Sequence, residues 1–218
     1  MMRRRIYHTL SMILPFACAA AAITVVVCDV VAVSFNPQYN PLRESISDLV
    51  PFAWGWLEEV GMAAAGLAQV LLAVIILTSE ASRTNPGLRL AGIMFAAIGL
   101  AFSIIITFNT DPGMAIVTVA GGIHVTTVII LAILFPANCL LLARAIRNQP
   151  DSSAMSHFSV IMAVIGLVVA WQVLPINQIR FVGLSERLLA GVNLAWIVFA
   201  GSHLPHLLEG KPHRKLDD

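Results

Sequence analysis

The sequence has few charged residues. Lysine, arginine, aspartate and glutamate make up 11% of its 218 residues, against about 25% in an average soluble domain. Apolar residues make up 58%. So few charged side chains cannot cover the water-facing surface of a globular domain of this length, which argues against a soluble enzyme. The same scarcity argues against a disordered chain and against a nucleic-acid-binding protein, because both need many charges. A polytopic membrane protein remains.

Cysteine is also scarce. The three cysteines, Cys18, Cys28 and Cys139, all lie inside apolar runs. None stands in a CxxC or cysteine–histidine spacing, which disfavours a disulfide scaffold and a cysteine zinc site. We expect three buried thiols that pack as small hydrophobic side chains, and we predict no metal and no cofactor.

Long apolar runs are what the sequence has in abundance. A helix that crosses a membrane needs roughly 20 mostly apolar residues. We predict an all-α fold, a polytopic bundle of six transmembrane helices that forms a single domain over residues 1–218. The predicted spans are residues 11–34, 54–78, 88–108, 114–145, 158–176 and 187–208, followed by a tail at 209–218. The runs do not alternate in polarity as the strands of a membrane β-barrel would.

Positive charge is distributed unevenly between the loops. Ten of the 13 lysines and arginines fall in the two terminal segments and the second and fourth loops, namely Arg3, Arg4, Arg5, Arg83, Arg89, Arg144, Arg147, Lys211, Arg214 and Lys215. The other three are Arg43, Arg180 and Arg187. Loops rich in lysine and arginine stay in the cytoplasm. We therefore predict a multi-pass protein of the cell membrane with both termini cytoplasmic.

The first outer loop, residues 36–51, is rich in polar side chains. Ser45 and Asp48 stand three residues apart and therefore share one face of a short helix, while Leu42 and Ile46 also follow helical spacing. We expect a short helix over the mouth of the bundle. It is either an interfacial connector or a segment that forms the wall of a pocket.

Carboxylates also lie within the predicted spans. Asp29 is about 8 Å below the outer end of the first span, at 1.5 Å per residue. A charge there costs about 2.5–3.5 kcal/mol, so Asp29 must be protonated or paired. Glu58 and Glu59 begin the second span and point about 100° apart, so one of them is expected to face the interior. The helix dipole is the alternative reason for acids at this position.

The third outer loop and the fourth span contribute Asp111 and His124. Asp111 precedes a proline and is expected either to cap the fourth helix or to belong to a site. His124 is the single histidine of the predicted outer half, and a merely buried, hydrogen-bonded histidine is the alternative to a functional one. As a catalytic set, Ser47 or Ser45 would be the nucleophile and His124 the general base, oriented by Asp111.

The last outer loop supplies cations beside these acids. The expected outcome is ion pairing around the mouth of the bundle, because desolvated charges must be paired. The candidate ligand-binding or ion-pair cluster comprises Asp29, Ser45, Asp48, Glu59, Arg180, Glu186 and Arg187. A carboxylate–histidine metal site of Glu59, Asp111 and His124 is a further alternative. The inner histidines, His157 and His203, are expected to be water-accessible, and the sequence leaves open whether they bind a metal or haem.

Several motifs of these loops occur in an order that is similar to a known family. Asn40-Pro41 leads to Ser45-x-Ser47-Asp48-Leu49, Asp111-Pro112-Gly113 precedes Gly122-x-His124, and Gly183-Leu184-x-Glu186-Arg187 opens the last span. Over about residues 12–207 the chain resembles the small bacterial and archaeal membrane proteins catalogued as domain-of-unknown-function family 998. The resemblance implies a six-helix integral membrane protein and brings no established substrate.

Three functions remain open from the sequence. The favoured one is the binding of a membrane lipid, or of a membrane partner that includes a second copy of the chain, at a polar site at the outer mouth. The second is a membrane-embedded hydrolase or transferase that acts on a lipid at the outer leaflet through Ser47, Asp111 and His124. The third is a small proton-coupled transporter that uses Asp29. No nucleic-acid partner is expected, and whether the protein is an enzyme stays open.

Overall fold

The structure is a computed structural model that describes residues 2–114, 116–173 and 181–209. All regular secondary structure in these residues is helical. The α-helices are α1 (Met2–Ser34), α2 (Trp56–Thr78), α3 (Ala81–Thr84), α4 (Pro86–Thr107), α5 (Val119–Ile146), α6 (Ser153–Val173) and α7 (Val182–Leu208). Two 3-10 helices, η1 (Ile46–Leu49) and η2 (Pro112–Met114), lie in the loops. The prediction of an all-α fold is confirmed.

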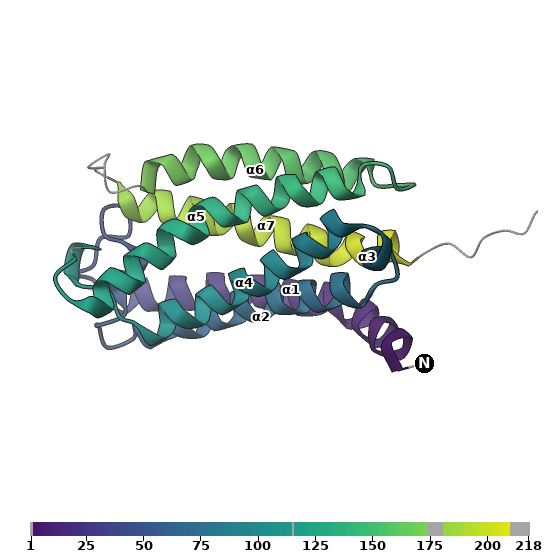
Figure 1. Cartoon of the computed structure of the whole chain (residues 1–218). Coiled ribbons are helices and arrows are strands. Elements are labelled where there is room, and N and C mark those ends of the chain that lie inside the picture. Colours follow the sequence, from purple (N-terminus) through teal and green to yellow (C-terminus); the bar gives the residue numbers. More distant parts are fainter. Residues whose placement is uncertain (1, 115, 174–180, 210–218) are drawn as a thin grey trace, which may run out of the picture.

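Six of these helices are long and apolar enough to cross a membrane: α1, α2, α4, α5, α6 and α7. Figure 1 shows them running side by side along the long axis of the molecule. Each of them packs against the next along the chain, and α7 returns to pack against α1, so the bundle closes into a ring. This architecture is that of a polytopic membrane protein.

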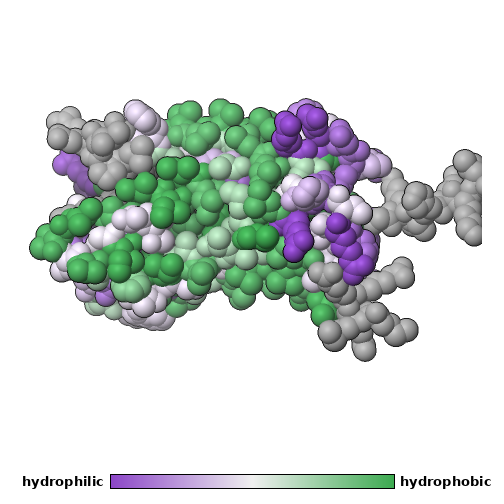
Figure 2. Space-filling view, viewed as in Figure 1, coloured by the Kyte–Doolittle hydropathy of each residue, from purple (hydrophilic) through white to green (hydrophobic). Residues whose placement is uncertain are grey.

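The surface of the bundle is apolar around its middle. Figure 2 shows a broad hydrophobic band over the helices, with hydrophilic residues gathered at the end near α3 and the α5–α6 connection. Large apolar side chains point outward, and Phe16, Leu100 and Val168 are each more than 60% exposed. Apolar surface of this extent is unfavourable in water but matches the hydrocarbon core of a bilayer.

Aromatic packing fills the centre of the bundle. Trp196 is fully buried, and its ring stacks on Phe95 with 5.0 Å between the centroids. The indole N–H donates to Ser159 Oγ at 2.9 Å, which satisfies the one polar group of this side chain. The three cysteines are free and buried as expected: Cys18, Cys28 and Cys139.

The helices α5 and α7 begin at other residues than the ends of the apolar runs in the sequence predict. The run that starts at residue 114 becomes helix α5 only at Val119, because Gly113 adopts a positive φ of 69° and Thr118 caps the helix. Helix α7 begins at Val182, before the predicted start at residue 187, because polar residues in its first turns lower the local hydropathy without preventing helix formation.

Both 3-10 helices lie at the same end of the bundle, which we call the η1 end. Figure 1 shows the first turns of α2, α5 and α7 there, with the last turns of α1 and α4. The start of α1 and the end of α7 lie at the opposite end. Loops that are far apart in the sequence therefore meet at the η1 end.

Candidate functional site

The Arg187 guanidinium joins three segments of the η1 end. Its Nε and Nη2 atoms donate to the two oxygens of Asp29 at 3.1 and 2.7 Å, which gives a bidentate ion pair between α7 and α1. Its Nη1 donates to the carbonyl of Pro41 at 2.9 Å, and Nη2 also donates to Tyr39 Oη at 3.2 Å. The carboxylate of Asp29 within the first span is therefore paired, as its position requires.

Tyr39 connects this ion pair to the loop before η1. Its hydroxyl is directed at the carbonyl of Ser45 at 2.7 Å. Burial raises the pKa of Tyr39, so the phenol keeps its proton and donates. Helix α7 also touches this loop at Gly183, where a Cβ would overlap the carbonyl oxygen of Glu44, so only glycine permits the approach. Sequence reasoning missed Tyr39, because a tyrosine in a polar loop gives no specific signal.

The η1 helix is held at its start by a capping box. Ser45 Oγ accepts from the Asp48 N–H at 3.1 Å, and Asp48 Oδ2 accepts from the Ser45 N–H at 3.1 Å. The other oxygen of Asp48 accepts from the Gly113 N–H at 2.8 Å and so ties η1 to η2. Glu186 Oε2 on α7 accepts from the Ile46 N–H at 2.7 Å. Ser45, Asp48 and Glu186 thus act together to fix η1.

Ser47 and His124 form a direct hydrogen bond across the η1 end. Ser47 Oγ lies 2.8 Å from His124 Nε2, and His124 Nδ1 lies 2.7 Å from the carbonyl oxygen of Phe108. Because a carbonyl only accepts, Nδ1 carries a proton, and in the neutral imidazole Nε2 accepts from the serine hydroxyl. The imidazole is thereby fixed in the tautomer and orientation that a general base for a serine nucleophile requires.

Asp111 lies beside this pair but contacts another group. Its Oδ2 accepts from the backbone N–H groups of Thr118 and Val117, each at 2.9 Å, and its Oδ1 accepts from Thr118 Oγ1 at 3.0 Å. Thr118 is the N-cap of α5, and Asp111 holds the turn before it. These hydrogen bonds stabilise the charged carboxylate and so lower the pKa of Asp111, and the bond from the Thr118 N–H has the largest effect. The group that orients His124 is the carbonyl of Phe108 rather than Asp111.

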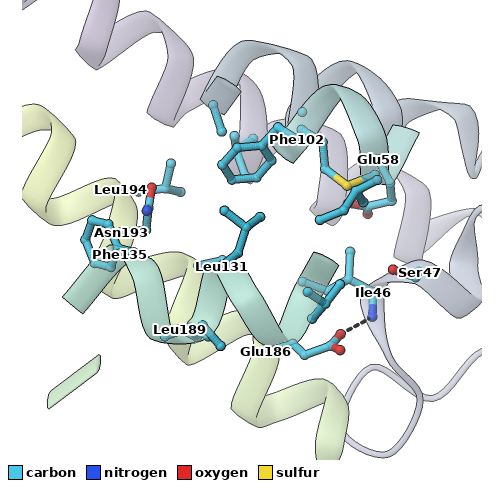
Figure 3. Close-up of a pocket in the computed structure, with 18 of the residues that line it drawn as sticks. Ile46, Ser47, Glu58, Phe102, Leu131, Phe135, Glu186, Leu189, Asn193 and Leu194 are labelled. Atoms are coloured by element: carbon cyan, nitrogen blue, oxygen red, sulfur yellow. Dashed lines mark hydrogen bonds between the residues drawn. The ribbon is translucent and has the colours of Figure 1, made fainter. Parts of the chain in front are cut away.

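A cavity of about 170 Å³ lies inside the bundle below η1. Its walls come from α1, α2, α4, α5 and α7, and most of its lining side chains are apolar, among them Met62, Phe102, Leu131, Phe135 and Leu189. Figure 3 shows Glu58, Ser47 and Glu186 at one end of this cavity, and Asn193 and Phe135 at the other. Ser47 also borders a smaller space together with Glu59 and His124.

Of the two adjacent glutamates at the start of α2, Glu58 faces the cavity. Glu58 is 4% exposed, and its Oε1 atom has no hydrogen-bond partner among the described residues. Glu59 is half-buried and borders the smaller space beside His124. The 100° spacing indicated that one of the two faces the interior. It could not indicate which one, because the rotation of α2 is set by its packing.

The remaining candidates are Arg180, the metal site and the inner histidines. Arg180 lies outside the described residues. Where side chains are described, no three histidine, cysteine, aspartate or glutamate residues gather as a metal-ligand set. His203 Nδ1 donates to the carbonyl of Phe199 at 2.9 Å, and His157 Nδ1 lies 3.2 Å from Ser153 Oγ, so each contacts its own helix.

The six apolar helices, with a polar cluster at one end of the bundle, define a polytopic integral membrane protein. The family described as "Protein of unknown function (DUF998)" matches residues 18–203, and the chain belongs to this family. The resemblance seen in the loop motifs is thus confirmed. No curated protein and no solved structure matches the chain.

The pairing of Arg187 with Asp29 predicts a coupled effect on stability. Arg187→Gln leaves the Asp29 carboxylate unpaired within the span. We expect a loss of about 2–3 kcal/mol in the free energy of unfolding, below the value for fully buried pairs because both side chains keep some exposure. The free energy is measured by titration with sodium dodecyl sulfate in mixed micelles.

The double variant Asp29→Asn/Arg187→Gln is expected to lose less stability than the sum of the two single variants. Arg83→Gln breaks an exposed pair with Glu80 and serves as the control, with an expected loss under about 1 kcal/mol. Strict additivity of the two single variants would contradict the coupling.

The lowered pKa of Asp111 predicts that this residue contributes to the stability of the folded protein in a pH-dependent way. The pKa of Asp111 is lower in the folded than in the unfolded chain. Its contribution to the free energy of unfolding is therefore complete at a pH above its pKa in the unfolded chain, and it is lost as the pH falls through its pKa in the folded chain. We expect Asp111→Asn to lower the Tm at pH 7, and the difference from the wild type to shrink below about pH 4. Glu80→Gln, at the opposite end, controls for the removal of a carboxylate. A difference that is constant from pH 7 to pH 3 would rule out this role.

Proposed function

We propose that the protein binds the apolar chain of a membrane lipid in the cavity, with the polar part of the lipid at the η1 end. The observation that carries the proposal is the lining of the cavity, which is mostly apolar apart from Asn193 at the far end and which carries Ser47, Glu58 and Glu186 at the end below η1. Its volume of about 170 Å³ is enough for an apolar group. For comparison, an engineered protein cavity of about 150 Å³ lined by leucine, isoleucine and phenylalanine binds benzene.

The distribution of charge supports an outer-leaflet lipid in the cell membrane. Ten of the 13 lysines and arginines lie in the terminal segments or in and next to the α2–α4 and α5–α6 connections. By the positive-inside rule, those segments face the cytoplasm. The η1 end is the opposite end of the bundle and then faces outward, so a lipid headgroup at Ser47 belongs to the outer leaflet.

A photoreactive phospholipid tests this binding. The protein is reconstituted with a phospholipid that carries a diazirine on one acyl chain, and crosslinked residues are mapped by mass spectrometry. We expect crosslinks to Leu131 and Phe135, which line the cavity. Ala65→Leu fills the cavity and is expected to remove them. Ala63→Leu, an exposed position on the same helix, is expected to keep them.

Crosslinks confined to the outer surface of the bundle would reject lipid binding in the cavity. Equal labelling of Phe135 in the Ala65→Leu and Ala63→Leu variants would reject it as well, because only the first substitution reduces the room inside.

A second function, acyl transfer from a lipid ester, is favoured by the hydrogen bond between Ser47 and His124. The Ser47 hydroxyl would attack the ester carbonyl carbon while its proton passes to His124 Nε2. The bond between the carbonyl carbon and the alcohol oxygen would then break, and His124 would return the proton to the leaving alcohol. Water activated by the same imidazole would cleave the acyl-serine and release a carboxylic acid.

Acyl transfer is tested by the release of fatty acid from a phospholipid with a fluorescent acyl chain in vesicles. We expect Ser47→Ala and His124→Gln each to lower the rate at least about 100-fold. This factor is the lower end of the range of about 100- to 10,000-fold that general acid–base catalysis contributes. Ser185→Ala, in the first turns of α7, is the matched serine control. If Ser47→Ala keeps the wild-type rate, or if the wild type releases no acid, the protein binds lipid without this chemistry.

A further inference from the structure

The cavity contains more carboxylates than nearby cations. Glu58 and Glu186 both line it at the η1 end. Arg187 follows Glu186 directly on α7 and is the cation that pairs with Asp29 at this end of the bundle. Its Nε and Nη2 atoms bind the two oxygens of Asp29, and its Nη1 binds the Pro41 carbonyl. Within the described part of the chain, no salt bridge to Glu58 or Glu186 forms.

Glu58 lies within hydrogen-bond reach of Asp29 on α1, and one of its two oxygens still has no partner among the described residues. Its side chain is buried to more than nine tenths, it lines the cavity, and its Oε1 accepts no hydrogen bond from the described residues. A buried polar atom without a partner costs about 1–3 kcal/mol, and more when it is charged. A donor supplied by a bound molecule would remove this penalty.

Glu186 adds a second acceptor on the same cavity. Its Oε2 accepts from the Ile46 N–H at 2.7 Å, and this single bond leaves acceptor capacity on the carboxylate. Burial disfavours the charged form of a carboxyl group unless a cation pairs with it, so two carboxyl groups on one cavity favour a cationic donor and disfavour an anion. An ammonium group matches both carboxylates, since it carries three donors and a positive charge.

We infer that the lipid bound in the cavity is an amphiphile with an ammonium group, which binds Glu58 and Glu186 while one apolar chain occupies the space between α2, α4, α5 and α7. The inference deepens the proposed lipid binding and rests on it. It assigns the headgroup chemistry: a primary amine is accepted, including the amine of a zwitterionic phospholipid, a neutral hydroxyl is bound less tightly, and an anionic headgroup without an amine is disfavoured.

The test compares three molecules of equal chain length. Decylamine, 1-decanol and decanoate are titrated by calorimetry at pH 7 into the purified full chain in maltoside micelles, with empty micelles as the blank. We expect the Kd of decylamine to be at least about tenfold lower than that of 1-decanol, and decanoate to bind most weakly, as the charge of the cavity requires.

Two variants assign the preference to the carboxylates. Glu58→Gln and Glu186→Gln are each expected to raise the Kd of decylamine by a larger factor than the Kd of 1-decanol, because the glutamine amide keeps an acceptor oxygen, for example for the Ile46 N–H, but cannot pair with the ammonium charge. Glu80→Gln, whose partner Arg83 lies at the opposite end of the bundle, is expected to bind all three like the wild type. Ala65→Leu is expected to abolish binding of both decylamine and 1-decanol.

The outcomes separate the inference from the function on which it rests. If decylamine and 1-decanol bind equally well to the wild type, the amine preference is wrong and lipid binding stands. If the preference survives in the Glu58→Gln/Glu186→Gln double variant, or if decylamine still binds to Ala65→Leu, the carboxylates of the cavity are not its site. If none of the three molecules binds, the proposed binding in the cavity falls together with the inference.

Discussion

The η1 end of the bundle depends on the pairing of Arg187 with Asp29. A carboxylate within a membrane span needs a cation, and here the cation comes from the last helix of the chain. The guanidinium has further N–H groups that are not bound to Asp29, and these donate to the Pro41 carbonyl and the Tyr39 hydroxyl. The loop before η1 is therefore fixed by the same group that neutralises Asp29, and the first and last helices are joined where the ring of the bundle closes.

This arrangement divides the polar groups into those that are satisfied and those that are not. Asp48 and Asp111 accept hydrogen bonds from backbone N–H groups, as does one oxygen of Glu186, and all three serve the local structure of the loops. Among the described residues, the side chains of Ser47 and Glu58 make no such contact with a loop N–H, and together with Glu186 they line the cavity below η1. The serine hydroxyl points at an oriented histidine, and the carboxylate of Glu58 has one oxygen without a partner. The proposed lipid binding and acyl transfer rest on these two features.

The Ser47–His124 pair also shows how a backbone group replaces a side chain that the sequence suggested. An acidic residue near a histidine in a loop–helix boundary predicts an orienting carboxylate. In the folded chain, the carbonyl of Phe108 at the end of α4 takes this position, and Asp111 supports the first turn of α5. A carbonyl fixes the tautomer as a carboxylate does, but without its charge. Every residue has a carbonyl, so no sequence pattern can point to this one.

The sequence alone determined the six-helix membrane fold. A helix that crosses the bilayer needs about 20 consecutive, mostly apolar residues, and each of the six runs meets this requirement by its own composition. It also determined that Asp29 needs a partner, and that Ser45 and Asp48 share one face of a short helix. Only the tertiary structure decided that Arg187 is that partner, that Glu58 rather than Glu59 faces the cavity, and that Ser47 meets His124. These contacts depend on the rotation and depth of neighbouring helices, which the packing of all six sets together and no single segment encodes.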